Sequence, residues 1–538
     1  MNDLPPRTLS VGEGEDVGRA VPGAREHLPW EALSRATGSP RIDGNSIGLQ
    51  FEGSTTFERW IEVIGRAKRF VHFENYIVRD DRVGRAFREA LVAKSMQGVP
   101  VRMLYDWIGC WATPRSYFKP LIDAGVEVLA FNRPRWTNPL NVFQRDHRKL
   151  VCVDGEVAFV GGFCIGVEWA DEGLLPPWRD TGVEIRGPAA AHAAQAFERI
   201  WEERGGVIPD SIRAHPERIE PQGEVPVWII QGEPGRSRFY RTLQLVAAHA
   251  RDRMWITDPY FVAPRPVSEA LAAAAVNGVD VRVLVPAHNN WPVVGSLSRA
   301  GYRFLLESGV RLFEWQGPMI HAKTSVADGI WCRVGSSNLN TASLLGNWEI
   351  DVGVVDESLA AQLEGLFLAD LASSVEIVLP GSGRTIVTRK GEQPTPVTPL
   401  DPQGTLQERL ERELRSSAPV GTRWRISDLV RAGSSFGEAL AGHRPLGRED
   451  RTVLGTVAIF TLPLGILGIF FPWILGWVAT AILIWLGGTS AVKAVVEGWR
   501  ARRARPGDPE RQPTSSGGVE GVTGEQMHKT ETEKANDS

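Results

Sequence analysis

The sequence predicts an α/β fold built from two similar halves in a pseudo-twofold arrangement, each a sandwich of helices, sheet and helices, followed by a C-terminal transmembrane helical hairpin. Three observations support this prediction. Strand-like and helix-like segments alternate along the chain, the same order of segments returns later, and residues 453–492 contain no charged side chain.

The alternation begins at residue 46. Segments 46–53, 69–77 and 99–106 have the composition and period of strands, whereas segments 57–68 and 83–98 place apolar residues at helical spacing. Strands that alternate with helices along a chain usually form a parallel sheet covered by helices. We therefore expect a parallel-rich sheet with helices on its faces.

The same order of segments returns over residues 225–286, and each series then runs on to a His-x-Lys sequence. Landmark residues recur at offsets that drift only from 184 to 174, as changes in loop length would produce; the pairs are Tyr76 and Tyr260, Gly98 and Gly278, and His147 and His321. An internal duplication explains this economically. We expect the two halves to pack as a pseudo-twofold pair.

Changes in composition set the expected domain boundaries. Glycine, proline and charged residues dominate the first segment, and a polar, Gly-, Ser- and Thr-rich tail ends the chain. The expected parts are a segment 1–44 that is poorly ordered apart from a short helical turn at residues 28–35, a first half 45–210, a second half 225–380, a linker with short helices 381–450, a membrane hairpin 453–492 and a basic, then disordered tail 493–538.

The charge and the cysteines exclude some function classes. The chain has 538 residues, a net charge of −4 and a pI near 6.3, so it lacks the basic excess of a nucleic-acid-binding protein. Its four cysteines are scattered without CxxC spacing, which indicates neither a zinc cluster nor a disulfide framework. We expect no nucleic-acid partner.

Each half contains one short set of reactive residues. Strand periodicity places the His and the Lys of a set on one face, and the Asp-Gly that follows is a hairpin-turn signal. A single His-x-Lys pair is typical of an ordinary surface strand, but two such sets suit phosphoryl chemistry: the ammonium groups neutralise phosphate, one imidazole attacks phosphorus and the other protonates the leaving group. The sets are His147, Lys149 and Asp154, and His321, Lys323 and Asp328.

The two stretches that contain these sets, residues 145–162 and 319–337, read HxKx4DG followed by GG or GSSN. This pattern resembles the double signature of the phospholipase D superfamily, and residues 44–380 are similar to bacterial cardiolipin synthases. The resemblance implies two phospholipase D-type sandwich halves. It also implies a phosphatidyltransferase that moves a phosphatidyl group between phosphatidylglycerol molecules, releases glycerol and forms a phosphohistidine. The resemblance implies no metal and no cofactor, because Lys149 and Lys323 supply the positive charge. A phospholipase D that uses water as acceptor needs the same residues, and a nuclease of the superfamily is the third interpretation.

The resemblance also implies residue roles. His147 would be the nucleophile and His321 the general acid and then base, and the supporting residues would be Glu349, Asp180, Ser336 and Asn338. Alternatives remain: the two aspartates of the sets could simply form turns, and Asp180 could be a surface partner of Arg179. Cys164 stands where the family often has Asn.

The uncharged segment 453–492 predicts the membrane hairpin, because about 20 helical residues span a hydrocarbon core of about 30 Å. Pro472 offers a break between two spans, and arginines before and after the segment place both flanks in the cytoplasm. A re-entrant hairpin and a buried helical pair are the alternatives. The expected location is the bacterial inner membrane, with the catalytic part in the cytoplasm.

Trp107 and Trp111 lie in the first half upstream of His147, together with Arg133. The tryptophans could line an acyl-chain groove, insert at a lipid interface or pack in the core. Arg133 could pair with a lipid phosphate or lie in a solvated loop.

Overall fold

The computed structural model describes residues 19–133, 144–171, 176–236, 238–290, 292–379 and 396–399. The predicted hairpin 453–492 and the tail 493–538 lie outside these residues, and so does nearly all of the linker 381–450. None of the helices in the described ranges combines the length and the hydropathy needed to cross a membrane.

The strands form one continuous sheet. The first half contributes β1 (Ile42–Gln50), β2 (Val71–Asn75), β3 (Val101–Asp106), β4 (Glu127–Phe131), β5 (Leu150–Val153), β6 (Val157–Gly161) and β7 (Gly182–Arg186). The second contributes β8 (Val225–Gly232), β9 (Arg253–Thr257), β10 (Asp280–Pro286), β11 (Arg311–Trp315), β12 (Thr324–Ala327), β13 (Trp331–Gly335), β14 (Glu349–Val355) and β15 (Ser374–Val378), and β16 (Val397–Pro399) pairs with β15.

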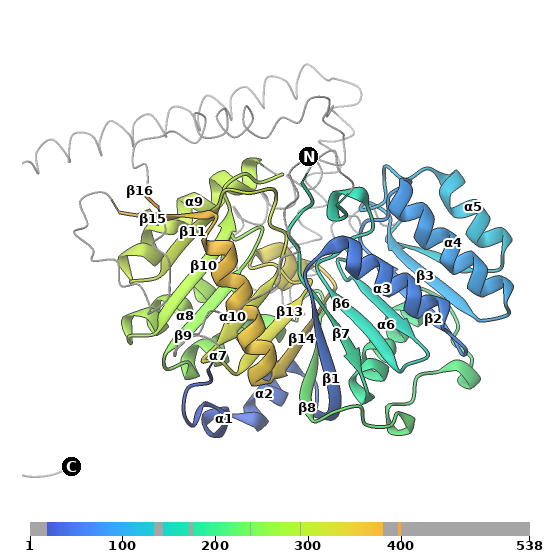
Figure 1. Cartoon of the computed structure of the whole chain (residues 1–538), viewed down its shortest axis with the longest axis horizontal. Helices are drawn as coiled ribbons and strands as arrows, with labels where there is room; N and C mark the ends of the chain where they lie inside the picture. Colours follow the sequence, from blue (N-terminus) through green and yellow to red (C-terminus); the bar gives the residue numbers. More distant parts are fainter. Residues whose placement is uncertain are drawn as a thin grey trace, which may run out of the picture. The chain divides into compact units, whose positions relative to one another are not determined.

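The order of strands is the same in both halves. It runs β4-β3-β2-β5-β6-β7-β1 in the first and β11-β10-β9-β12-β13-β14-β8 in the second, with β15 and β16 added beyond β11. The antiparallel pair β1 and β8 joins the halves in the middle of the sheet (Figure 1). This symmetry agrees with the predicted duplication.

The sheet is mixed, so the expectation of a parallel-rich sheet was wrong. Parallel pairing is confined to β2-β3-β4, β9-β10-β11 and β15-β16. The hairpins β5-β6 and β12-β13 form at the Asp-Gly turns, and the remaining pairs are also antiparallel. The Asp-Gly turns of the two reactive sets therefore make the strands that they join antiparallel to each other.

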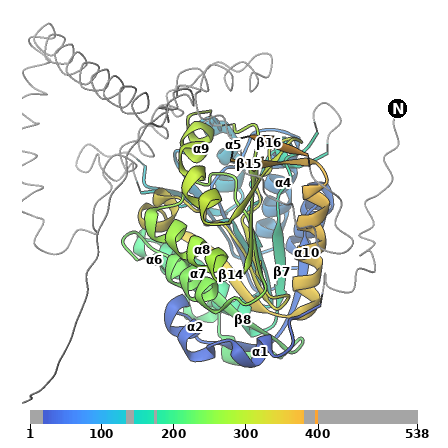
Figure 2. The same ribbon diagram turned by 90° about the vertical axis from the view of Figure 1, so that its left-hand side faces the viewer.

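Helices cover both faces of the sheet. The helices are α3 (Gly53–Gly65), α4 (Arg82–Met96), α5 (Arg115–Asp123), α6 (Pro188–Glu203), α7 (Arg238–His249), α8 (Arg265–Val276), α9 (Pro292–Glu307) and α10 (Glu357–Leu371). Helices α3 to α5 share a core with one face of the first half, and α7 to α9 with one face of the second. Helices α6 and α10 share the core on the other face, and Figure 2 shows α10 on one side of the sheet with α7 and α8 on the opposite side.

The last helix of each half reaches the other half. Helix α6 contacts β8, and α10 contacts β1. Six buried alanines on α6, from Ala189 to Ala196, let this helix approach the sheet closely. Both helices belong to one apolar core that contains strands of both halves. The halves therefore share buried surface as well as a sheet.

The described part of the N-terminal segment is more ordered than expected. It contains α1 (Ala24–His27) and α2 (Trp30–Thr37), which overlaps the expected helical turn, and both helices pack on the second half. Leu33 is fully buried, and the ring of Trp30 stacks on Trp228 at a centroid distance of 5.8 Å. Apolar side chains in a segment rich in Gly, Pro and charge are sufficient to dock it.

Candidate active site

The two His-x-Lys sequences lie at the junction between the halves. His147 and Lys149 immediately precede β5, and His321 and Lys323 immediately precede β12. The backbone N–H of His147 donates to the carbonyl of Trp348 at 2.9 Å, and that of His321 donates to the carbonyl of Arg179 at 2.6 Å. Each histidine is thus fixed by backbone from the opposite half.

A carboxylate from the opposite half holds each imidazole. Nδ1 of His147 lies 3.0 Å from Oε2 of Glu349, the first residue of β14, and Nδ1 of His321 lies 2.7 Å from Oδ2 of Asp180, just before β7. An ionised carboxylate only accepts hydrogen bonds, so each Nδ1 carries the proton and each Nε2 keeps its lone pair. This geometry is what a nucleophile or a general base requires.

The two carboxylates are themselves held in place. Ser336 donates its hydroxyl to Oε2 of Glu349 at 2.5 Å, and the indole N–H of Trp169 donates to Oδ2 of Asp180 at 2.8 Å. A Cβ on Gly162 would come within 1.9 Å of the Asp180 carboxylate, so only glycine fits there. Trp169 was missed in the sequence because nothing in the second half repeats it.

Asp180 is not a surface partner of Arg179. The Asp180 side chain is fully buried, and the Arg179 guanidinium instead pairs with Asp370 of α10 at 3.1 Å. Since Asp370 belongs to the second half, this ion pair is a further contact between the halves.

A tyrosine accompanies each lysine. The Lys149 ammonium lies 5.0 Å from the ring centroid of Tyr76, which is 4.8 Å from the His147 ring. Lys323 lies in the same way 5.9 Å from Tyr260. These tyrosines were used in the sequence only as markers of the duplication, although the same offset could have identified them as site residues.

The third residue of each set lies away from the imidazoles. Asp154 and Asp328 follow the far ends of β5 and β12, and both have positive φ, 59° and 51°. Each carboxylate accepts three backbone N–H groups at 2.7 to 3.0 Å, from residues 68–70 in the first half and 251–253 in the second. This geometry supports the turn-forming alternative for both aspartates.

Asn338 and Cys164 occupy matching places after β13 and β6. The Asn338 amide donates to the hydroxyl of Ser343 at 3.3 Å, and its buried Oδ1 accepts no hydrogen bond from the described residues. The Cys164 thiol is buried, and burial raises its pKa. All four cysteines of the chain are buried and free.

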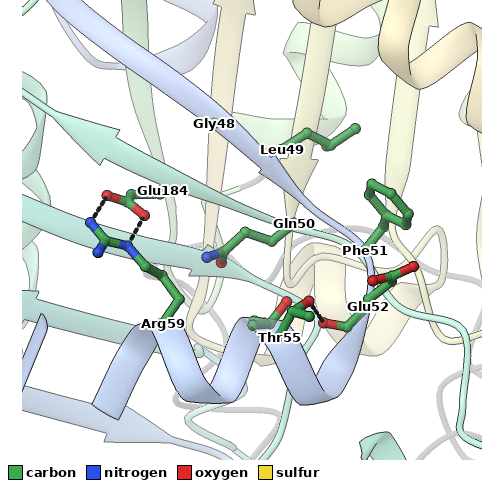
Figure 3. Close-up of a pocket in the computed structure, with 9 residues that line it drawn as sticks. Gly48, Leu49, Gln50, Phe51, Glu52, Thr55, Arg59 and Glu184 are labelled. Atoms are coloured by element: carbon green, nitrogen blue, oxygen red, sulfur yellow. Dashed lines mark hydrogen bonds and ion pairs between the residues drawn. The ribbon is translucent and has the colours of Figure 1, made fainter. Parts of the chain in front are cut away.

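A separate pocket of about 260 Å³ lies between the end of β1 and the start of α3 (Figure 3). Among its described lining residues the cation is Arg59, which forms two hydrogen bonds of 2.9 Å with Glu184. It is lined by Gly48, Leu49, Gln50, Phe51, Glu52, Thr55, Thr56, Arg59 and Glu184. The predicted catalytic residues are not among them.

Comparisons with known proteins agree with this arrangement. The family model described as "Cardiolipin synthase, PLD-like domain" matches residues 60–201 and 245–371, one stretch in each half. The chain belongs to this family. It is a phosphatidyltransferase-type enzyme of the phospholipase D superfamily.

The chain is also similar to cardiolipin synthases over about two thirds of its length. The enzyme is 36% identical over 354 residues to cardiolipin synthase A of Pseudomonas aeruginosa, which covers 64% of this chain and 71% of the relative. It is 34% identical over 365 residues to cardiolipin synthase A of Pseudomonas fluorescens, which covers 67% of this chain and 76% of the relative. The crystal structure of phosphatidylserine synthase from Haemophilus influenzae has a similar fold, with a TM-score of 0.51, 17% identity, and coverage of 64% of this chain and 90% of that one.

The electrostatics of this phospholipase D-type site differ between its halves. Burial, together with the nearby ammonium groups, lowers the pKa of His147, and the same causes lower that of His321 to about 3. Burial and the neighbouring Lys149 lower the pKa of Lys323 to about 7, against the opposing effect of Asp180. Each lysine also lowers the pKa of the histidine of the other half, so the four groups form one electrostatic cluster.

The carboxylates of Asp180 and Glu349, which hold the two imidazoles, remain ionised in this cluster. Burial alone would raise the pKa of Asp180 and of Glu349, but the facing imidazole and ammonium groups lower both pKa values. In the described ranges, no group of three or more His, Cys, Asp or Glu side chains is placed to hold a metal ion.

Proposed function

We propose that this enzyme is a cardiolipin synthase-like phosphatidyltransferase, which moves a phosphatidyl group from one phosphatidylglycerol to a second and releases glycerol. The observation that carries the proposal is the exchanged pairing of His147 with Glu349 and of His321 with Asp180. It provides two imidazoles with the same tautomer beside two ammonium groups. One nucleophile and one proton donor are what a two-step phosphoryl transfer requires.

In the first step, Nε2 of His147 attacks phosphorus of the donor lipid, following the family resemblance. A phosphorus–nitrogen bond forms and the bond from phosphorus to the glycerol oxygen breaks. His321 gives its proton to the leaving alkoxide, so that glycerol departs as a neutral alcohol. Lys149 and Lys323 neutralise the charge that develops on the phosphoryl oxygens.

In the second step, a hydroxyl of a second phosphatidylglycerol replaces the departed glycerol. His321, now neutral, removes the hydroxyl proton, and the oxygen attacks phosphorus as the bond to His147 breaks. The pKa of about 3 keeps His321 neutral in the empty enzyme. The anionic phosphodiester of the donor lipid supplies a countercharge that favours the protonated imidazole, so binding of the substrate prepares the acid for the first step.

Hydrolysis is the alternative, because a phospholipase D uses the same residues and accepts water in the second step. The imidazoles are deeply placed, with only 8% of His147 and 5% of His321 exposed. Restricted access to water favours a lipid hydroxyl as acceptor over hydrolysis. A nuclease of the superfamily is disfavoured by the acidic pI of the chain.

For the membrane attachment we propose the hairpin of residues 453–492 as an anchor in the bacterial inner membrane, with the catalytic halves on the cytoplasmic side. The support is the uncharged sequence and its arginine-rich flanks. A two-span anchor would hold the active site beside its insoluble substrates.

The test is incubation of the membrane-embedded full chain with phosphatidylglycerol labelled in its headgroup and acyl chains. The transferase releases labelled glycerol and forms cardiolipin, also in the presence of a chelator, whereas a hydrolase forms phosphatidic acid. His147→Ala and His321→Ala should each abolish product formation. If either variant keeps full activity, the two-histidine mechanism is wrong.

A further inference from the structure

Two tryptophans project from the loop that follows β3. This loop, residues 107–114, connects the end of β3 to α5 and is here called the tryptophan loop. Trp111 is 48% exposed, and its ring meets the half-buried ring of Trp107 edge to face at 4.7 Å. An indole as exposed as that of Trp111 is unusual on a protein surface, because this ring buries a large apolar area when it contacts a partner.

The tryptophan loop is fixed to the catalytic end of the first half. Asp106 accepts hydrogen bonds from the backbone N–H groups of Ile108 and Gly109, at 2.9 and 2.8 Å. Its other oxygen accepts the N–H of Asp146, the residue before His147, at 3.0 Å. One buried carboxylate therefore shapes the loop and ties it to the catalytic strand.

Close packing removes the remaining freedom of the loop. A Cβ on Gly109 would lie 1.8 Å from the carbonyl oxygen of Tyr76, the tyrosine that contacts His147. The Thr113 hydroxyl donates to the carbonyl of Val78. Since the backbone beneath Trp111 is held on both sides, the indole is held outward by a rigid support.

Positive charge accompanies the exposed indole. Arg115 at the start of α5 and Arg133 after β4 are both exposed, and both act on the half-buried phenol of Tyr105 between them. Neither guanidinium forms an ion pair with a carboxylate of the described residues. An exposed tryptophan with two nearby arginines matches the interfacial region of an anionic bilayer, where the indole lies among headgroups and the cations meet phosphates.

We infer that Trp107, Trp111, Arg115 and Arg133 form an interfacial anchor that seats the catalytic end of the first half on a bilayer containing anionic phospholipid. This inference rests on the proposed function, which requires an insoluble lipid to reach His147. The sequence also has a tryptophan at position 291, which lies 180 residues after Trp111, the same offset as between Gly98 and Gly278. Trp291 lies outside the described residues.

The direct test measures contact with lipid. The full chain, carrying Trp111→Cys labelled with an environment-sensitive fluorophore, is reconstituted in phosphatidylglycerol-containing vesicles with and without brominated acyl chains. The matched control is Phe304→Cys, because Phe304 is also 48% exposed but lies near the end of α9 that leads to β11, opposite the catalytic end. We expect bromolipids to quench the label at 111 and to leave the label at 304 unchanged.

The second test separates bilayer engagement from chemistry. Arg115→Gln and Arg133→Gln should each raise the apparent KM for phosphatidylglycerol in anionic vesicles about fivefold, and Trp111→Ala should shift it in the same direction. The rate on a monomeric short-chain phosphatidylglycerol should stay within twofold of the unmodified enzyme. Equal quenching at 111 and 304, or an equal loss on both substrates, would overturn the inference. Quenching at 111 without transfer of any phosphatidyl group would instead overturn the proposed function alone.

Discussion

Nδ1 of His147 lies 3.0 Å from the carboxylate of Glu349, a residue 202 positions later in the other half of the chain. The reciprocal pair, His321 and Asp180, spans 141 positions in the opposite direction. Because each imidazole takes its orienting carboxylate from the other half, neither half contains a complete site. This exchange gives a physical reason why the two halves remain in one chain and share one sheet.

The exchange predicts a specific defect for Glu349→Gln. The amide oxygen can still accept the Nδ1 proton, but it lacks the negative charge that stabilises an imidazolium or a histidine bonded to phosphorus. We expect kcat to fall about 100-fold with little change in KM. The control is Glu357→Gln on the exposed start of α10, which should leave kcat unchanged. Equal kcat in the Glu349 variant and the unmodified enzyme would refute a role for the carboxylate.

The assignment of His147 as the nucleophile can be tested by trapping. Rapid denaturation of the enzyme at mildly alkaline pH during turnover, where a phosphorus–nitrogen bond persists, followed by proteolysis and mass spectrometry, should place a phosphatidyl adduct on a peptide containing His147. Such an adduct forms only when Nε2 is free, as the Nδ1 contact with Glu349 allows. An adduct found on His321 would exchange the two roles and leave the rest of the mechanism intact.

The burial of His321 predicts a loss of stability in acid. Its pKa is about 3 in the folded enzyme and about 6.5 in the unfolded chain, so between these values only the unfolded chain binds the proton. The free energy of unfolding therefore decreases as the pH falls below about 6.5, by about 2 kcal/mol between pH 7 and pH 5. The lowered pKa of His147 adds to this decrease.

The matched variant for this prediction is His321→Asn, which removes the titrating group. Unfolding midpoints measured in detergent at pH 7 and pH 5 should differ less for the variant than for the unmodified enzyme. An identical loss in both proteins would show that other groups cause the acid sensitivity.

Much of the fold and the site was readable in the sequence, for identifiable reasons. The duplication preserved the order of strands. The offsets between paired residues of the two halves, such as Tyr76 and Tyr260 or His147 and His321, therefore located both reactive sets. Trp169 could not be found in this way, because its hydrogen bond to Asp180 exists in one half only. The docking of residues 19–37 on the second half also escaped prediction, since long-range burial of Leu33 leaves no local pattern.

The turn geometry predicts that Asp154→Ala affects stability more than chemistry. The substitution removes three hydrogen bonds to backbone N–H groups and places alanine at a φ of 59°. We expect a loss of about 2–4 kcal/mol in the free energy of unfolding and a clear fall in Tm. The fraction that stays folded at low temperature should keep its kcat, because the carboxylate lies at the far end of β5 from His147. A 100-fold drop in kcat at unchanged Tm would show instead that Asp154 takes part in the reaction.

The close approach of Gly162 to Asp180 predicts that one added methyl group can displace the carboxylate that holds His321. A Cβ at position 162 would lie 1.9 Å from Oδ1 of Asp180, so the carboxylate must move and release Nδ1 of His321. We expect Gly162→Ala to reduce kcat at least tenfold, because a misplaced acid protonates the leaving alkoxide poorly. Gly65→Ala is the control, since its Cβ would meet no atom within 4 Å. If the defect arises through the proton donor, the Gly162 variant should recover much of its rate with a donor lipid whose leaving group is a phenol, which departs without protonation. A variant equally slow on both substrates would instead have lost the nucleophilic step or the fold.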